Sequence, residues 1–317
     1  MVAFRSAKGD THSLAGPKGP YSLFGLESMR DHRPSVVTGN NPVDLFQIAA
    51  DNAGRLEAEF RRVAADRPAA DRPLLQTFAD EVAAHGRISI NMRPWIAADF
   101  VQNDRYQNMY QAVAEASALS GRNSDELLQE RLGKYYALRL AFDRAFDHGD
   151  RFRYGALNIG SAGTRQYGIF CIVFRGDFPP PGEQVAYLKT DSLKGYVAAD
   201  GTLEEAALRR DAAGPAQRHI LAAIKHAGDV TRRAGRWPDM VCGEDTYIEA
   251  IFITEVTTAT VAEVRVLERD YRDLWNLCFA AHGRTASEEE KAIAFDFLSL
   301  LRADRAGVIQ IRVVSDA

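Results

Sequence analysis

The residue with the clearest chemical potential is Glu249, which interrupts an apolar run. The segment reads YIEAIFITEV and is typical of a β-strand. Burying a carboxylate there is costly unless the group is paired or takes part in chemistry. The two-residue period of a strand places Glu249 on one face with Tyr247 and Ile251. Two interpretations stay open: a carboxylate presented into a cleft, or a glutamate that faces solvent from an edge strand.

Other catalytic patterns are missing from the sequence. It contains no phosphate-binding loop that ends in Lys-Ser or Lys-Thr, no GxGxxG fingerprint and no HExxH motif. The IGSAG segment after Asn158 lacks the spacing of a nucleophile elbow and predicts a turn between two strands. Neither the histidines nor Cys171, Cys242 and Cys278 have metal-ligand spacing. We therefore expect no metal, and reduced thiols that are mostly buried.

The elements around Glu249 are a mixture of strands and helices. Helices are predicted over residues 104–148, over residues 203–234 and in SEEEKAIAFDFLSLLRAD, where Ser287 and Glu290 form a capping box. Strands are predicted in RISINMR, RYGALNIG, YGIFCIVFRG, QVAYLKT, TYIEAIFITEV, ATVAEVRVLE and GVIQIRVV. Because strands and helices do not alternate strictly, the predicted fold class is α+β.

Two further sections precede the first predicted strand. Residues 1–40 are rich in Gly, Ser, Pro, His and Lys and show no periodicity, so we expect a disordered leader. It is interpreted either as an unstructured tail or as an uncleaved signal for a contact-dependent secretion system. Residues 41–85 predict a helical section of two or three segments, broken at Pro68 and ending at Gly86.

Composition limits the classes of protein that fit. The chain has 317 residues, enough for an enzyme-sized core, and its net charge of −4 argues against a dedicated nucleic-acid or membrane-surface binder. No stretch approaches the ~20 apolar residues of a membrane span. We expect a cytoplasmic protein, or one delivered into a host cell without a cleaved signal peptide.

Several stretches together resemble a known family. They are ISINMRPW, DRYQNMYQ, ERLGKYY, RYGALNIG followed by RQYGIFCIVFRGD, and YIEAIFITEVTTATVAEVRVLERDYRD. From residue 88 to about 272, over half of the chain, their order and spacing resemble a bacterial and fungal family associated with the ADP-ribosyltransferase fold. The resemblance implies that residues 86–317 form an ADP-ribosyltransferase-like domain, a split β-sandwich.

The resemblance also implies a substrate and a site. Proteins of this class take NAD and use an Arg or His on an early strand, a Ser-rich or Tyr-bearing segment, and a Glu on a later strand. The third element falls on Glu249, which becomes the expected catalytic residue. The expected NAD-binding residues are Arg93, Ser117, Ser120, Tyr154 and Tyr167.

The implied activity is transfer of ADP-ribose from NAD to a protein acceptor, which suits a bacterial toxin or secreted effector. The chain departs from the family near Met92, where relatives tend to carry His, and in MYQAVAEASALSGRN, where they have a Thr/Ser/Gly-rich turn. Tyr247 stands where many arginine-modifying members carry a second Glu, which disfavours an arginine acceptor. Two alternatives stay open: a catalytically degenerate relative that binds a partner, and an unrelated soluble hydrolase.

Overall fold

A computed structural model describes residues 43–283 and 286–315 of the chain, so the leader expected at 1–40 lies outside the described residues. The described strands form one open sheet in the order β5-β4-β6-β2-β1-β3-β7-β8. Their bounds are β1 Arg87–Met92, β2 Arg153–Asn158, β3 Phe170–Phe174, β4 Val185–Leu188, β5 Ala212–Ala213, β6 Glu249–Phe252, β7 Val261–Leu267 and β8 Ile311–Val314. Every strand segment predicted from the sequence contains one of these strands.

The sheet is mixed rather than parallel. Neighbouring strands are antiparallel except for β7 and β8, which are parallel. Parallel neighbours need a crossover connection, and here helices α12 (Glu268–His282) and α13 (Glu288–Arg305) provide it. Helices and strands do not alternate regularly along the chain, in agreement with the predicted α+β class.

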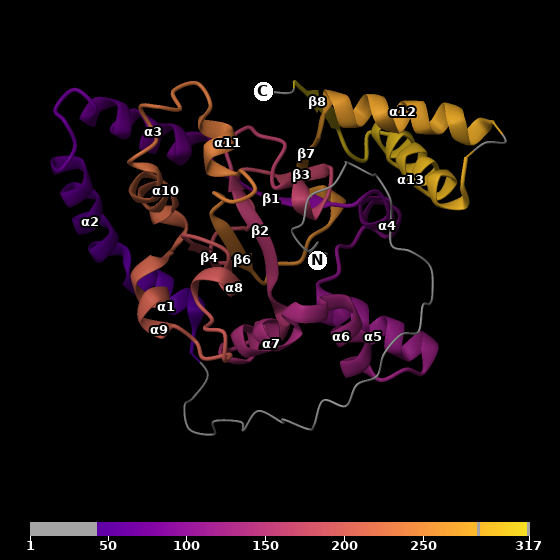
Figure 1. Cartoon of the computed structure of the whole chain (residues 1–317), viewed down its shortest axis with the longest axis horizontal. Coiled ribbons are helices and arrows are strands. Elements are labelled where there is room, and N and C mark those ends of the chain that lie inside the picture. The colour runs from indigo at the N-terminus through magenta and orange to yellow at the C-terminus, as the bar shows by residue number, and fades with distance from the viewer. Residues whose placement is uncertain (1–42, 284–285, 316–317) are drawn as a thin grey trace.

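The other helices surround the sheet. Figure 1 shows α2, α3 and α10 together beside one half of the sheet, while α12 and α13 lie beside the other half. The bounds are α1 Leu45–Asp51, α2 Ala53–Ala65, α3 Arg72–His85, α4 Pro94–Asn103, α5 Met109–Ser120, α6 Ser124–Leu132, α7 Tyr136–Arg144, α8 Ser192–Gly195, α9 Glu205–Asp211, α10 Arg218–His226 and α11 Trp237–Val241.

The helical section predicted over 41–85 consists of α1, α2 and α3. Its last helix ends at Gly86, as predicted, and the N–H of Gly86 closes that helix on Val82. Phe78 and Val82 of α3 belong to the same hydrophobic core as Ile88 and Ile90 of β1. The section therefore packs directly on the sheet and shares its core.

One predicted helix is wrong as a single element. Residues 203–234 form α9, then the short strand β5, a 3-10 turn at Pro215–Gln217, and α10. The first helix ends at Asp211, and Ala212–Ala213 pair with β4. Pro215 then prevents the helix from resuming at once, because proline has no backbone N–H and disfavours the helical conformation of the residue before it. By contrast, the predicted capping box of Ser287 and Glu290 starts α13 as expected.

The two faces of the sheet differ in chemistry. Along β1, Ile88 and Ile90 lie in the large hydrophobic core with residues of α3, α4, α10 and α13. Ser89 and Asn91 alternate with them and are equally buried. The opposite face of the sheet is therefore polar at its centre, and buried polar groups there must be hydrogen-bonded to one another.

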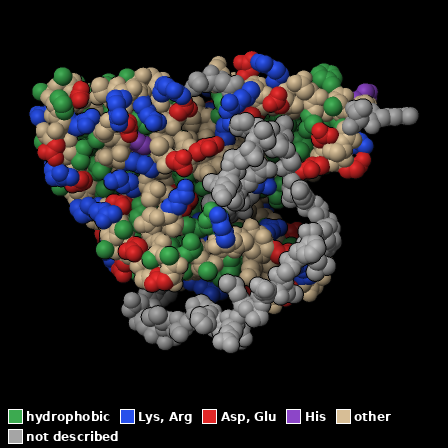
Figure 2. Space-filling model, viewed as in Figure 1, with side chains coloured by type: hydrophobic (Ala, Val, Ile, Leu, Met, Phe, Trp, Pro, Cys, Tyr) green, Lys and Arg blue, Asp and Glu red, His purple; other side chains and the backbone are tan. Residues whose placement is uncertain are grey.

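The surface carries a mixture of charges. On the face drawn in Figure 2, Lys and Arg side chains are interspersed with Asp and Glu side chains over the helices at the left. No single sign of charge dominates that part of the face. No helix of the described residues is long and apolar enough to cross a membrane.

Candidate functional site

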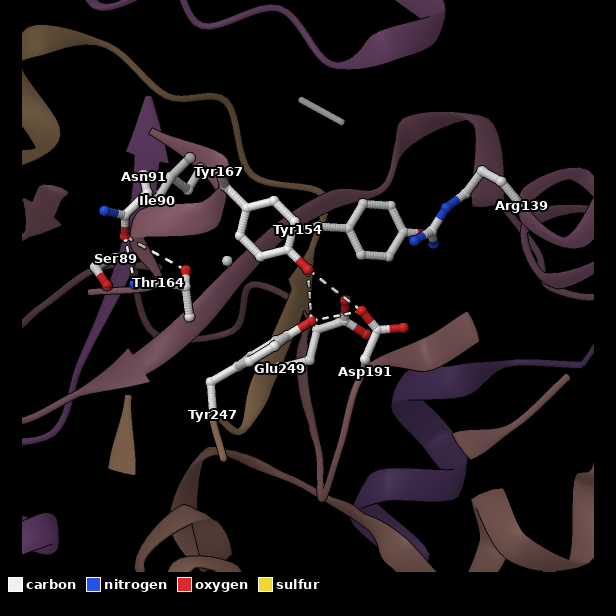
Figure 3. Close-up of a pocket in the computed structure, with 11 residues that line it drawn as sticks. Ser89, Ile90, Asn91, Arg139, Tyr154, Thr164, Tyr167, Asp191, Tyr247 and Glu249 are labelled. Carbon is white, nitrogen blue, oxygen red and sulfur yellow. Dashed lines mark hydrogen bonds between the residues drawn. The ribbon is translucent and has the colours of Figure 1, made fainter. Parts of the chain in front are cut away.

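A small cavity opens on the polar face of the sheet, at strands β1, β2 and β6. Its volume is about 30 Å³, which is room for one or two water molecules. Strand residues form its floor, and the segment after β4, the loop between β2 and β3, and α7 supply its walls (Figure 3). The lining residues are Ser89, Ile90, Asn91, Arg139, Tyr154, Gly155, Thr164, Tyr167, Asp191, Tyr247 and Glu249.

Glu249 is a buried residue of an internal strand. Strand β6 lies between β4 and β2, and the Glu249 residue is 4% exposed. The interpretation of a solvent-facing glutamate on an edge strand is therefore wrong. The predicted alternation is confirmed: Ile248 and Ala250 lie in the large core on the other face. Because β6 is hydrogen-bonded to β4 on one side and to β2 on the other, the backbone of Glu249 is held in place, and its carboxylate lies at the cavity.

The surroundings of Glu249 favour its neutral form. Burial and the neighbouring Asp191 raise the pKa of Glu249 to about 8, although Arg139 acts in the opposite direction. One carboxylate oxygen accepts a 2.8 Å hydrogen bond from the backbone N–H of Ser192, which also favours the ionised form. A carboxyl group whose pKa lies this close to neutral pH can change its charge when a ligand changes its surroundings.

Asp191 is the second acid of the cavity and lies at the start of the short helix α8. One of its carboxylate oxygens accepts from the N–H groups of Leu193 and Lys194. The other accepts a 2.6 Å hydrogen bond from the Tyr247 hydroxyl. Asp191 is therefore held by backbone and side chain together, and it is 2% exposed.

Two tyrosines extend this network across the cavity. The hydroxyl oxygens of Tyr167 and Tyr247 are 2.9 Å apart, and the Tyr167 hydroxyl also lies 3.4 Å from Asp191 (Figure 3). Because Tyr247 donates to Asp191, the Tyr167 hydroxyl donates either to Tyr247 or to Asp191. Burial, together with the nearby carboxylates, raises the pKa of both phenols, so both remain protonated donors.

Arg139 brings a positive charge to the back of the cavity from helix α7. It is 2% exposed, its guanidinium carbon lies 3.9 Å from the centre of the Tyr154 ring, and one of its nitrogens donates to the Ser192 hydroxyl at 3.2 Å. Burial acts against this charge, but Tyr154, Asp143, Glu249 and Asp191 together raise the pKa of Arg139. The guanidinium therefore stays charged beside the two acids.

Asp143, one turn further along α7, anchors this arginine and the tyrosine. Its carboxylate lies 3.5 Å from Arg139 and accepts hydrogen bonds from the hydroxyls of Tyr154 and Tyr110. The carboxylate is 2% exposed, and burial raises the pKa of Asp143. The pair of Arg139 and Asp143 thus fixes the Tyr154 ring against the cavity.

Asn91 holds the loop that carries Tyr167. Its amide nitrogen donates to the carbonyls of Ala162 and Gly168, and its amide oxygen accepts from the N–H of Thr164. Gly163 has a positive φ of 77°, and a side chain there would collide with the Asn91 oxygen at 2.1 Å. The IGSAG segment is thus the predicted turn, tied to β1 at one side chain.

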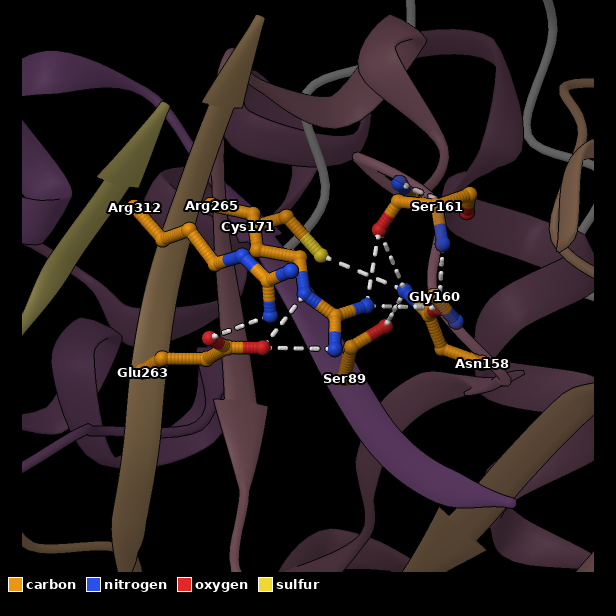
Figure 4. A network of polar contacts seen from close by, with 9 residues as sticks. Ser89, Asn158, Gly160, Ser161, Cys171, Glu263, Arg265 and Arg312 are labelled. Carbon is orange, nitrogen blue, oxygen red and sulfur yellow. Dashed lines mark hydrogen bonds and ion pairs between the residues drawn. The ribbon is translucent and has the colours of Figure 1, made fainter. Parts of the chain in front are cut away.

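A second polar network adjoins the cavity through Ser89. Arg265 pairs with Glu263 at 2.6 Å and donates to the side chain of Asn158 and the carbonyl of Ser161 (Figure 4). Asn158 in turn donates to Ser89. The polar groups of this network are hydrogen-bonded to one another. We therefore interpret the network as a support for the turn after β2 and place the proposed chemistry in the cavity.

The structure brings together some of the residues predicted from the sequence and separates others. Glu249, Tyr154 and Tyr167 line the cavity. Arg93 precedes α4 and does not line it. The remaining two predicted residues lie in the last turn of α5, where Ser117 donates to the Arg122 carbonyl and Ser120 to the Ala116 carbonyl. Their hydroxyls are used within that helix end rather than at the cavity.

Sequence reasoning missed Arg139, Asp143 and Asp191. Arg139 and Asp143 are four residues apart on a helix whose neighbours include Leu140 and Phe142, so a charged pair on an apolar helix face was a readable signal. Asp191 precedes Ser-Leu in TDSLKG, a pattern typical of a helix N-cap. Neither signal says which strand such residues approach.

No cluster of three or more His, Cys, Asp or Glu among the described residues is arranged to hold a metal ion. The free thiols Cys171 and Cys242 are buried and Cys278 is partly buried.

No protein-family model matches the chain, and no curated protein matches it significantly.

Proposed function

We propose that the protein cleaves the bond between nicotinamide and ribose in NAD and transfers ADP-ribose to a protein acceptor. One observation carries the proposal: a nearly fully buried glutamate on an internal strand faces a cavity with three tyrosines and an arginine. This is the placement that the resemblance implies for the catalytic residue. The fold that the resemblance implies, an ADP-ribosyltransferase-like split β-sandwich, is part of this proposal, whereas the described strands are ordered as one open sheet.

The charges around the cavity suit the positive nicotinamide ring of NAD. Glu249 and Asp191 face the cavity, and Arg139 is the cation that lines it. With Glu249 neutral, the charges of Asp191 and Arg139 balance, so a further cation is attracted once Glu249 ionises; the charge of that cation lowers the pKa of Glu249 from about 8 and favours the carboxylate form. Tyr154 and Tyr167 line the cavity and supply the aromatic rings on which a cationic ring would stack, although Arg139 already lies over the Tyr154 ring.

In the proposed reaction Glu249 accepts a hydrogen bond from a ribose hydroxyl next to the reacting carbon. The bond from that carbon to the nicotinamide nitrogen breaks, and nicotinamide leaves as a neutral molecule with the bonding electrons. The positive charge that develops on the ribose is stabilised by the nearby carboxylate, as in glycoside cleavage. A nucleophile of the acceptor then bonds to the carbon and releases a proton.

The cavity needs to widen before it admits a nicotinamide ring. Its volume of about 30 Å³ is far below the hundreds of Å³ of ordinary ligand sites. Tyr167, like Tyr154, is a partly exposed lining residue, but it sits in a 3-10 turn, Arg165–Tyr167, of a loop. We therefore assign to Tyr167 the movement that opens the site.

The test is release of nicotinamide from NAD by the purified full chain, with labelled NAD and candidate acceptor proteins present. A matched pair of variants makes it specific. Glu249→Gln removes the proposed carboxylate, whereas Glu255→Gln changes an exposed glutamate six residues later. The proposal requires turnover that survives Glu255→Gln and is lost with Glu249→Gln. Equal turnover in both variants contradicts it.

The small volume favours a second candidate, a catalytically degenerate relative that binds a partner. Such a protein keeps Glu249 as a neutral structural group within the network of Asp191 and Tyr247. It gives no nicotinamide release at any enzyme concentration, and Glu249→Gln leaves its partner binding unchanged. Measuring both properties on the same two variants separates the candidates.

A further inference from the structure

A second, larger cavity lies among helices α5, α6 and α7. Figure 1 shows these helices below the sheet. Its volume is about 410 Å³, within the range of sites that take small molecules. The buried apolar side chains that line it are Val113, Leu128, Leu140 and Phe146. The cavity therefore offers an apolar floor large enough for a ring or a short alkyl chain.

Acidic groups predominate among the charged residues of this cavity. Asp125 and Asp150 are exposed and Asp143 is buried, while Arg144 is the lining residue with a fixed positive charge, and His148 also lines the cavity. Among the described residues, no ion pair involves Asp125 or Asp150. Their charges are therefore available to a cation that enters.

Asp143 is the polar group at the inner wall. Its two oxygens accept from Tyr110, which lines this cavity, and from Tyr154, which lines the cavity of Glu249. A ligand that reaches the inner wall thus meets a buried carboxylate and a phenol. Arg139 already pairs with this carboxylate, so the attraction for a cation comes mainly from Asp125 and Asp150, while the buried carboxylate adds a hydrogen-bond acceptor and disfavours an anion.

We propose that this second cavity binds a small organic cation, an ammonium or guanidinium group on an apolar body. The apolar body packs on Leu128, Leu140 and Phe146, and the charged group lies between Asp125, Asp150 and the inner carboxylate. This site is independent of NAD cleavage. Its ligand contacts Asp143, which accepts a hydrogen bond from Tyr154, and Tyr110, which is linked to Tyr154 through Asp143.

The experiment measures by calorimetry how tightly the full chain binds 2-phenylethylammonium chloride, which serves as the probe. Two compounds of similar size serve as controls, the neutral 2-phenylethanol and the anion phenylacetate. We expect the amine to bind at least about tenfold more tightly than the alcohol, and phenylacetate to show no binding. A tenfold ratio corresponds to about 1.4 kcal/mol.

Variants locate the binding. Ala114→Trp, at an exposed lining position of α5, places a large side chain at the cavity and abolishes binding. Asp125→Asn and Asp150→Asn each weaken binding roughly threefold, as expected for partly solvated ion pairs. Glu126→Gln, the same kind of change on an exposed residue outside the lining, leaves it unchanged.

Three outcomes overturn the proposal: no binding of the amine, equal binding of the alcohol, or unchanged amine binding in Ala114→Trp. The unfolding temperature of each variant is measured alongside, so a loss of binding counts only for a variant that remains folded. Because the probe is not a substrate, the result does not depend on whether the protein cleaves NAD. Failure of either proposal therefore leaves the other standing.

Discussion

The carboxylate of Glu249 accepts a 2.8 Å hydrogen bond from the backbone N–H of Ser192, the first residue of α8. The next N–H groups of that helix, those of Leu193 and Lys194, serve Asp191 instead. One helix start thus holds two buried acids side by side. Burial and the neighbouring Asp191 raise the pKa of Glu249 and favour its neutral form. The hydrogen bond from Ser192 favours the ionised form, so a nearby cation can shift Glu249 to the carboxylate.

The first prediction concerns activity. Glu249→Gln is expected to lower nicotinamide release by about a hundredfold or more, the size of effect caused by losing one preorganised electrostatic contact. The fold is expected to persist, because Gln has almost the same shape and can still accept from Ser192. Initial rates and thermal unfolding measured on the same preparations check both parts. Glu255→Gln is the control, and a loss of structure in Glu249→Gln contradicts the prediction.

The second prediction concerns stability against pH. The folded pKa of Glu249 is about 8, above its ordinary value of 4.5, so between these values the folded chain binds a proton that the unfolded chain has released. The contribution of this group to the free energy of unfolding therefore falls as pH rises from about 5 to 8. Glu249→Gln removes this term, so its stability relative to wild type is expected to increase over that interval.

Denaturant unfolding at pH 5, 6.5 and 8 measures this difference. Asp143 also has a raised pKa, but it contributes equally to both proteins and cancels from the comparison. If the difference in unfolding free energy between wild type and Glu249→Gln stays constant with pH, Glu249 is not a buried carboxyl group with a raised pKa.

Much of the scaffold was predictable from the sequence because local rules govern it. Strand alternation located β6 and the face of Glu249, and the Ser287 capping box located the start of α13. The cost of a carboxylate in an apolar strand singled out Glu249 before any neighbour was known. An interruption near Gly214-Pro215 was readable by the same rules, but the end of α9 at Asp211 depends also on the pairing of Ala212–Ala213 with β4.

The composition of the cavity was not predictable in this way. Arg139 and Asp191 are 110 and 58 residues from Glu249 in sequence, and the packing of α7 and the strand order bring them to it. Ser117 and Ser120 were chosen because a motif placed them, yet their hydroxyls bond to backbone carbonyls of their own helix end. A pattern along the chain identifies residue types, whereas the neighbours of a residue depend on tertiary packing.

The third prediction concerns the buried pair on α7. Arg139→Met leaves Asp143 without its cation, and removing one partner of a buried pair costs about 3 kcal/mol of unfolding free energy. Adding Asp143→Asn to Arg139→Met is expected to restore part of this loss, because the unpaired charge disappears. Arg144→Met is the control on an exposed neighbour and changes stability by less than about 0.5 kcal/mol. Denaturant unfolding measures all three, and an equal cost for Arg139→Met and Arg144→Met contradicts the pairing.

The last prediction links Asp191 to the pH dependence of the proposed reaction. After burial, the charge of Asp191 is the largest influence that raises the pKa of Glu249. If ionised Glu249 is required, kcat/KM rises with pH and reports the pKa of the free enzyme, about 8. Asp191→Asn removes the charge and keeps one oxygen that can cap α8, while its amide NH2 group takes the place of the oxygen that accepts from Tyr247. The midpoint of the kcat/KM profile of Asp191→Asn is therefore expected at a lower pH than the midpoint of the wild-type profile.

Asp177→Asn, at an exposed position outside the cavity lining, is the matched control and should keep the wild-type midpoint. The profiles are measured as nicotinamide release at low NAD concentration from pH 5.5 to 9.5. If the midpoint of the pH profile is the same in Asp191→Asn as in wild type, the rate does not depend on the ionisation of Glu249. A rate that falls as pH rises through 8 assigns the active form to protonated Glu249, which rules out the proposed role of its carboxylate.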